Sequence, residues 1–491
     1  MNERVQKLRE QSVTAVPHIC PERARYVTET YKKYEGTVSI PELRALAFKN
    51  YLENKTIVIY EGELIVGEKG AHAQGAPTFP ELCCHSLDDL EVMNRREHIS
   101  FAVSAEAFVA QRDEIIPFWE RRSIRNKIFA AMPRKWKDCY EAGIFTEFME
   151  QRGPGHTVGS RNIFIKGFKD YKEEINAALA RLDYINDPLA LDRRDELNAM
   201  LIACDAIITF AKRYARLAQE MAAAENDPAR RAELSQIAEN CETVPANKPS
   251  SYWQAIQAYW FVHIGVTTEI NPWDAFSPGR LDQHLNPFYI ADCANGILDE
   301  CRAKELLECL WIKFNNQPAP PKVGITLKES STYTDFANIN TGGITEDGED
   351  GVNDVSYLIL DCMDETRLLQ PSSNVQISKK TPARFLKRAC EISRKGWGQP
   401  AFYNTDAIVA ELLNAGKSID DARRGGASGC VETGAFGSEA YILTGYFNLP
   451  KILELTLYNG YDRLTKKQLG LELGYAADFK SYEDFLAAYK K

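Results

Sequence analysis

Long amphipathic patterns dominate the middle of the chain. Between Asp195 and Ala224 apolar residues recur every three or four positions, which predicts a helix with one apolar face. Asp227 and Pro228 then supply an N-cap residue and a first-turn proline, so a second helix is expected through Cys241. The same helical spacing predicts three further helices, over residues 303–314, 382–395 and 405–414.

Short runs with strand character lie between the predicted helices. Residues 56–60 and 64–66 are apolar and β-branched, and the Glu-Gly pair between them is typical of a turn, so the two runs predict a β-hairpin. Residues 374–378 predict a strand, and another is expected near Ile442 and Leu443. Because strands alternate with helices, the pattern predicts an α/β fold.

Composition narrows the classes of protein to which the chain can belong. The net charge of −10 repels phosphate backbones and anionic lipid, so neither nucleic acid nor a membrane is an expected partner. The sequence has no run of about eighteen apolar residues that could span a bilayer, and its charged start lacks the apolar segment of a secretory signal. The twelve cysteines follow no disulfide or zinc spacing, so Cys83 and Cys84 are expected to be packed thiols and the location cytoplasmic.

A glycine-rich loop over residues 423–434 holds Cys430 and Glu432 with one residue between them. In an extended segment such residues point to the same side, so sulfur and carboxyl would face one pocket. From the residues alone, three interpretations are open: a thiolate nucleophile, an inert structural cysteine, and a thiyl radical that abstracts hydrogen from a C–H bond. The first requires a lowered thiol pKa, whereas the neighbouring carboxylate would raise that pKa.

The run GASGCVETG, residues 426–434, resembles the cysteine loop of the glycyl radical enzymes, in the form found in their dehydratase branch. Pyruvate formate-lyase has a second cysteine where this chain has Val431, so acyl transfer is not expected. Segments similar to the family extend along essentially the whole chain and include residues 61–68, 370–374 and 399–404. The runs 147–152, 155–158, 273–276 and 330–337 are similar to the members of the branch that dehydrate trans-4-hydroxy-L-proline.

The resemblance implies a partial ten-stranded α/β barrel surrounded by helices, with an N-terminal helical region. Residues 1–491 are expected to form a pyruvate formate-lyase-like domain that is incomplete at its C-terminus. The loop that carries the family's radical glycine is not found in the sequence, so the glycyl radical domain is expected to be absent and the chain inactive alone. A capping residue, Ser481, predicts a helix close to the last residue, Lys491, which fits a truncated chain.

The resemblance also implies loss of water from trans-4-hydroxy-L-proline to give (S)-1-pyrroline-5-carboxylate. Cys430 would carry the thiyl radical, and Glu432 and His156 would lie at the departing hydroxyl. The other positions that match the family's substrate site are Asp274 and Asp335, which would face the charged ring nitrogen, and Ser330, Phe148, Phe336 and Tyr446. Without the resemblance, Asp274 is more simply explained as a loop cap and Asp335 as an acidic residue at a helix N-terminus.

The partners follow from the same resemblance. We expect no directly bound cofactor or metal, and a glycyl radical installed by a separate activating enzyme that uses S-adenosylmethionine and an iron–sulfur cluster. The substrate would be a small amino acid, the complete enzyme a homodimer, and its source an anaerobe. Two alternatives stay open: a glycerol- or propanediol-type glycyl radical dehydratase, and a non-catalytic fragment of such an enzyme.

Overall fold

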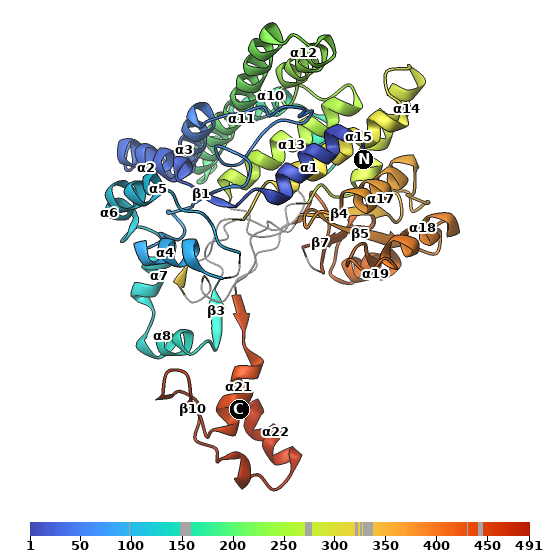
Figure 1. Cartoon of the computed structure of the whole chain (residues 1–491). Coiled ribbons are helices and arrows are strands. Elements are labelled where there is room, and N and C mark those ends of the chain that lie inside the picture. The colour runs from blue at the N-terminus through green and yellow to red at the C-terminus, as the bar shows by residue number, and fades with distance from the viewer. Residues whose placement is uncertain are drawn as a thin grey trace.

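The computed structural model describes residues 1–97, 99–147, 159–270, 277–319, 323–324, 327, 337–429, 431–439 and 445–491. The first part of the chain is mainly helical and ends in a short strand (Figure 1). Its elements are α1 (Glu3–Thr14), β1 (His18–Cys20), α2 (Glu22–Tyr34), α3 (Ile40–Asn54), β2 (Gly75–Pro77), α4 (Leu87–Arg95), α5 (Ala105–Ala110), α6 (Ile116–Trp119), α7 (Ile124–Ala131), α8 (Arg134–Glu141) and β3 (Phe145–Glu147).

The middle of the chain forms a helical layer around one almost fully buried helix. Its elements are α9 (Asn162–Ile165), α10 (Phe168–Leu179), α11 (Ala190–Ala224), α12 (Pro228–Thr243), α13 (Tyr252–Glu269), α14 (Leu281–Ala294) and α15 (Glu300–Asn315). Helix α13 is apolar around most of its circumference and lies in the main core, where Trp260 and Phe261 are fully buried. Helix α11 runs alongside α3 and α12.

The predicted helices of this layer are confirmed. Helix α11 covers residues 195–224 and begins five residues earlier than expected, at Ala190. Helix α12 begins at Pro228, and the Asp227 carboxylate accepts hydrogen bonds from the Ala229 and Arg230 N–H groups at 3.1 and 3.4 Å. Helix α15 covers the predicted range 303–314.

A three-stranded parallel sheet, in the order β4-β5-β6, forms the other half of the body (Figure 1). Its region contains β4 (Asn338–Gly342), α17 (Asp354–Thr366), β5 (Ser372–Ile377), α18 (Ala383–Ser393), β6 (Ala401–Asn404), α19 (Thr405–Asn414), α20 (Ile419–Arg424), β7 (Gly426–Ser428) and β8 (Glu432–Gly434). Val375 of β5 is buried in one apolar cluster with residues of α17 and α18. Strand β5 and helices α18 and α19 confirm the sequence predictions, and the strand–helix alternation confirms the α/β class.

The hairpin predicted over residues 56–66 is wrong, because none of these described residues belongs to a strand. The turn itself forms, with Gly62 in the left-handed region at φ +80°. The flanking backbone bonds to side chains instead of to a second strand: Val66 donates to Gln257 Oε1 at 2.9 Å and accepts from Gln257 Nε2 at 2.8 Å. Buried backbone groups need partners, and here helix α13 supplies them.

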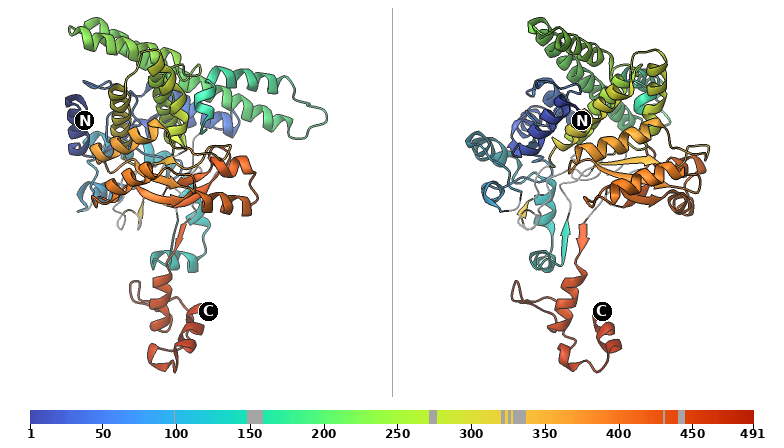
Figure 2. Two further views of the ribbon diagram at one scale, coloured as in Figure 1. Left: turned by 90° about the vertical axis from the view of Figure 1, so that its right-hand side faces the viewer. Right: turned by 45° about the vertical axis from the view of Figure 1, so that its right-hand side comes forward.

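The last part of the chain forms an arm that extends away from the body (Figure 2). Its elements are β9 (Gly445–Phe447), α21 (Leu449–Leu457), β10 (Tyr461–Asp462), β11 (Lys467–Gln468) and α22 (Tyr482–Lys490). Strand β9 pairs antiparallel with β3, about 300 positions earlier in the chain. The helix predicted after Ser481 is α22, whereas the strand expected near Ile442 and Leu443 lies outside the described residues.

Three further observations bear on ligands and membranes. Cys83 is buried beside Phe79 and Leu82, Cys84 is partly buried, and both are free thiols, which confirms the expected packing. Within the described ranges, the histidines, cysteines and acidic residues form no group of three that could hold a metal ion. Across those same ranges, no helix combines the length and apolar character needed to cross a bilayer.

Candidate functional site

The glycine-rich loop folds as a short antiparallel hairpin of β7 and β8, in which Gly426 pairs with Gly434 and Ser428 with Glu432. Gly429 and Val431 are turn residues between the strands, and Gly429 adopts φ +54°, a conformation that glycine allows at little cost. Cys430 itself lies outside the described residues. The sequence therefore places this cysteine in the turn of a hairpin that is described on both sides.

Glu432 is the first residue of β8, and its side chain is partly buried. Its Oε2 atom accepts a hydrogen bond from the Val431 N–H at 3.1 Å. Val431 belongs to the turn, with 67% of its side chain exposed. The extended geometry expected from the sequence thus begins at Glu432, and the direction of the Cys430 side chain stays a prediction.

The base of the hairpin is fastened to the parallel sheet by a buried arginine. Arg280 donates from Nε and Nη2 to the Gly425 carbonyl at 3.1 and 2.7 Å, and from Nη1 to the Gly342 carbonyl at 2.9 Å. Burial lowers the pKa of Arg280 to about 10. Asp282, two residues later, accepts from the Gly342 N–H at 2.7 Å and from Ser356 Oγ at 2.6 Å. Burial raises the pKa of Asp282 to about 6.

The hairpin also lies on a set of buried carboxamides that sequence reasoning missed. Asn338 and Asn340 alternate with Ile339 along β4. Asn374 and Gln376 alternate with Val375 along β5 in the same way. Polar residues at every second position of a buried strand were the available signal, because such residues share one face of the sheet. Strand β7 packs against this face of β4 (Figure 1).

Of the nine predicted site residues, Glu432 and Tyr446 are described. Tyr446 lies in β9 opposite Thr146 of β3, with 59% of its side chain exposed. The remaining seven lie outside the described residues: Cys430, His156, Asp274, Asp335, Ser330, Phe148 and Phe336. Their mutual geometry stays a prediction.

Comparisons with known proteins agree with this fold. The sequence pattern of the pyruvate formate lyase-like family matches residues 1–491. The chain is 66% identical over 489 residues to trans-4-hydroxy-L-proline dehydratase of Clostridioides difficile, and the match covers 100% of this chain and 62% of that protein.

Two solved structures give the same result. The crystal structure of hydroxyproline dehydratase from Clostridioides difficile with trans-4-hydroxy-L-proline bound matches with a TM-score of 0.95 at 66% identity, over 100% of this chain and 62% of that one. The glycerol-bound B12-independent glycerol dehydratase from Clostridium butyricum matches with a TM-score of 0.92 at 32% identity, again over 100% and 62%. The expected glycyl radical enzyme fold is confirmed, and the chain spans about three fifths of the length of these relatives. The chain belongs to the pyruvate formate lyase-like family.

Proposed function

We propose that this protein removes water from trans-4-hydroxy-L-proline and releases (S)-1-pyrroline-5-carboxylate. The observation that carries the proposal is the 66% identity, over 489 residues, with trans-4-hydroxy-L-proline dehydratase. The hairpin supports it, because its turn residues Gly429 and Val431 flank Cys430 in the sequence and a cysteine in a glycine-rich turn can approach a substrate closely. The radical would be stored on a glycine and installed by an activating enzyme with S-adenosylmethionine and an iron–sulfur cluster.

The proposed reaction moves one hydrogen and expels one water. The Cys430 thiyl takes a hydrogen atom from the ring carbon beside nitrogen, which forms a thiol and leaves a carbon radical. Glu432 gives a proton to the neighbouring hydroxyl and the C–O bond breaks, because hydroxide without a proton is a poor leaving group. The ring nitrogen gives up one proton, which balances the one supplied, and the thiol returns its hydrogen to the carbon that lost oxygen.

The positive charge of the substrate gives two of the remaining site residues a role in binding. The ring nitrogen of the substrate is positive at neutral pH, so the carboxylates of Asp274 and Asp335 are suited to bind it. His156 would lie beside the departing hydroxyl, and the other lining residues would be Ser330, Phe148, Phe336 and Tyr446. The complete enzyme is proposed to act as a cytoplasmic homodimer.

A glycerol- or propanediol-type dehydratase is the second candidate, and the structural match to a glycerol dehydratase favours it. A neutral diol has no cation to bind, so the two candidates differ in what they require of Asp274. The experiment activates the complete, full-length enzyme anaerobically with its activating enzyme, supplies trans-4-hydroxy-L-proline, and follows pyrroline-5-carboxylate. We expect product, and we expect Asp274→Asn to lower kcat/KM by about 100-fold, since truncating one partner of a buried charge pair has an effect of this order.

Other outcomes separate the candidates. A glycyl radical signal without product would keep the family and reject the substrate, and diols would be assayed next. Normal hydroxyproline turnover by the Asp274→Asn protein would reject the proposed contact with the ring nitrogen.

Glu432→Gln tests the proton donor. Glutamine keeps the shape of the side chain but supplies no acidic proton, so kcat is expected to fall by about 10²–10⁴-fold at an unchanged radical yield. The control is Glu411→Gln on the exposed face of α19, which is expected to retain wild-type kcat. A Glu432→Gln protein with wild-type kcat would assign the proton to another group.

A further inference from the structure

The hairpin that leads into Cys430 is held by a side chain that imitates a neighbouring strand. Asn340 of β4 accepts a hydrogen bond from the Ala427 N–H at 3.0 Å through Oδ1, and its Nδ2 donates to the Ala427 carbonyl at 2.7 Å. These two bonds reproduce the pair that opposite residues exchange in an antiparallel ladder. A single carboxamide therefore satisfies both backbone groups of the central residue of β7.

A second carboxamide reaches the residue directly before Cys430. Asn338 Nδ2 donates to the Gly429 carbonyl at 3.0 Å. Its Oδ1 in turn accepts from Asn374 Nδ2 of β5 at 2.9 Å. The contact therefore holds the entrance of the turn, at the last described atoms before the cysteine.

Neighbouring side chains fix which way the Asn340 amide faces. Gln376 Nε2 donates to Asn340 Oδ1 at 2.6 Å, and Thr405 Oγ1 donates to Gln376 Oε1 at 3.2 Å. With its oxygen already engaged, Asn340 must direct its N–H group to the Ala427 carbonyl. Thr405, Gln376 and Asn340 are fully buried, and a satisfied buried network of this kind is rigid.

The hairpin backbone also rests directly on these amides. A Cβ atom added to Gly426 would lie 2.4 Å from Gln376 Nε2 and 2.6 Å from Asn340 Oδ1. Such distances are far below contact, so only glycine lets the strand approach this closely. The register of β7 against the sheet is consequently set by contacts on both sides of Ala427.

We infer that Asn338 and Asn340 are positioning residues for Cys430, acting through the Gly429 and Ala427 backbone. Their effect on turnover rests on the proposed role of Cys430 in hydrogen abstraction, whereas the fastening of the hairpin does not. A sulfur atom that must meet a C–H bond is sensitive to displacement, because a shift of about 1 Å can lower a rate about 100-fold.

Hydrogen exchange on this 491-residue chain tests the fastening. In Asn340→Ala both bonds to Ala427 are lost, so amides of a peptide over residues 425–434 are expected to exchange about tenfold faster or more. Peptides from α11 are expected to keep wild-type exchange, which shows that the variant is folded. The matched control is Asn315→Ala, which removes a buried carboxamide that donates to Ser12 Oγ at 2.9 Å, far from the hairpin in sequence. Equal hairpin exchange in the two variants would overturn the inference.

Kinetics of the activated complete enzyme test the consequence for turnover. Asn338→Ala and the milder Asn338→Ser are expected to lower kcat by roughly 10–100-fold while KM and the glycyl radical signal stay at wild-type values. The isotope effect on kcat with substrate deuterated beside nitrogen is expected to rise, because hydrogen transfer becomes slower. A reduced kcat with an unchanged isotope effect, or an unchanged kcat, would overturn the positioning role. Absence of turnover in the complete wild-type enzyme would reject the proposed function, and the exchange experiment would still decide whether the two asparagines hold the hairpin.

Discussion

At the scale of single residues, His284 links stability to pH. Its ring stacks on Phe164 at 5.3 Å between centroids, and Nε2 lies 3.3 Å from Ser160 Oγ. Burial, together with the nearby Arg280 and Arg161 charges, lowers the pKa of His284 from 6.5 to about 3. Between these values the unfolded chain binds a proton that the native protein does not, so the free energy of unfolding falls as pH decreases, by up to about 1.4 kcal/mol per pH unit.

The variant His284→Gln is expected to lack this contribution. Urea unfolding at pH 7, 6 and 5 should therefore show a wild-type stability that falls more steeply toward acid than that of the variant. Asp282, whose pKa is raised by burial to about 6, acts in the opposite direction, because its folded form binds a proton first as pH falls. Because Asp282 is present in both proteins, its contribution cancels when the variant is compared with the wild type. Parallel plots of the free energy of unfolding against pH for the two proteins would contradict the prediction.

At the scale of elements, helix α12 depends on its N-cap. The Asp227 side chain accepts from two N–H groups of the first turn, and Pro228 occupies the first helical position. Asp227→Ala removes the acceptor and is expected to lower the free energy of unfolding by about 1 kcal/mol. Asp227→Ser keeps an acceptor oxygen and is expected to retain most of that stability in the same urea titration. If both variants lost the same free energy of unfolding, the acceptor oxygen at position 227 would contribute little to the stability of the helix.

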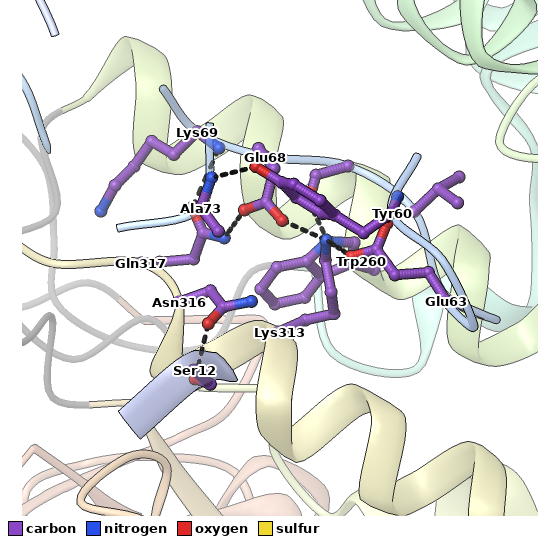
Figure 3. A network of polar contacts seen from close by, with 12 residues as sticks. Ser12, Tyr60, Glu63, Glu68, Lys69, Ala73, Trp260, Lys313, Asn316 and Gln317 are labelled. Carbon is purple, nitrogen blue, oxygen red and sulfur yellow. Dashed lines mark hydrogen bonds and ion pairs between the residues drawn. The ribbon is translucent and has the colours of Figure 1, made fainter. Parts of the chain in front are cut away.

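At the scale of the whole molecule, a buried charge cluster joins three distant parts of the chain (Figure 3). Lys313 of α15 bonds to Glu63 at 2.8 Å and to Glu68, while Trp260 of α13 donates to the Gly67 carbonyl at 2.9 Å. Although burial opposes the charged form, the two carboxylates hold the pKa of Lys313 above its ordinary value. The cluster therefore fixes segment 63–68 to both helices, in place of the predicted hairpin.

Removing the lysine tests this cluster. Lys313→Met leaves two buried carboxylates without their cation and is expected to destabilise the protein by about 3–5 kcal/mol in urea unfolding. A triple variant that adds Glu63→Gln and Glu68→Gln is expected to regain much of this loss. The control is Lys212→Met, whose partner Glu242 lies 3.8 Å away in an exposed pair, with an expected change of about 1 kcal/mol or less. A comparable loss in both single variants would contradict the prediction.

Local spacing in the sequence determined the helices and the position of the cysteine loop. Helix α11 and the Asp227 cap of α12 follow from contacts between residues a few positions apart, so periodicity and capping residues suffice to predict them. The local composition of residues 374–378 was enough to predict that β5 is a strand, but not which strands lie beside it. The motif around Cys430 likewise marked the glycine-rich loop that contains Glu432, and the structure shows Glu432 at the start of β8. The chemical role of the pair stays a proposal.

Tertiary structure alone decided how that loop is held and how segment 56–66 runs. Asn340 and Ala427 are 87 positions apart, and Val66 and Gln257 are 191 apart. Bonds between such residues depend on which strands and helices become neighbours, and a strand-like pattern can be satisfied equally by another strand or by buried side chains. The sequence could therefore mark 56–66 as a segment with strand character, but it did not identify the buried amides of β4, and the partners of both sets of polar groups emerged only when the fold closed around them.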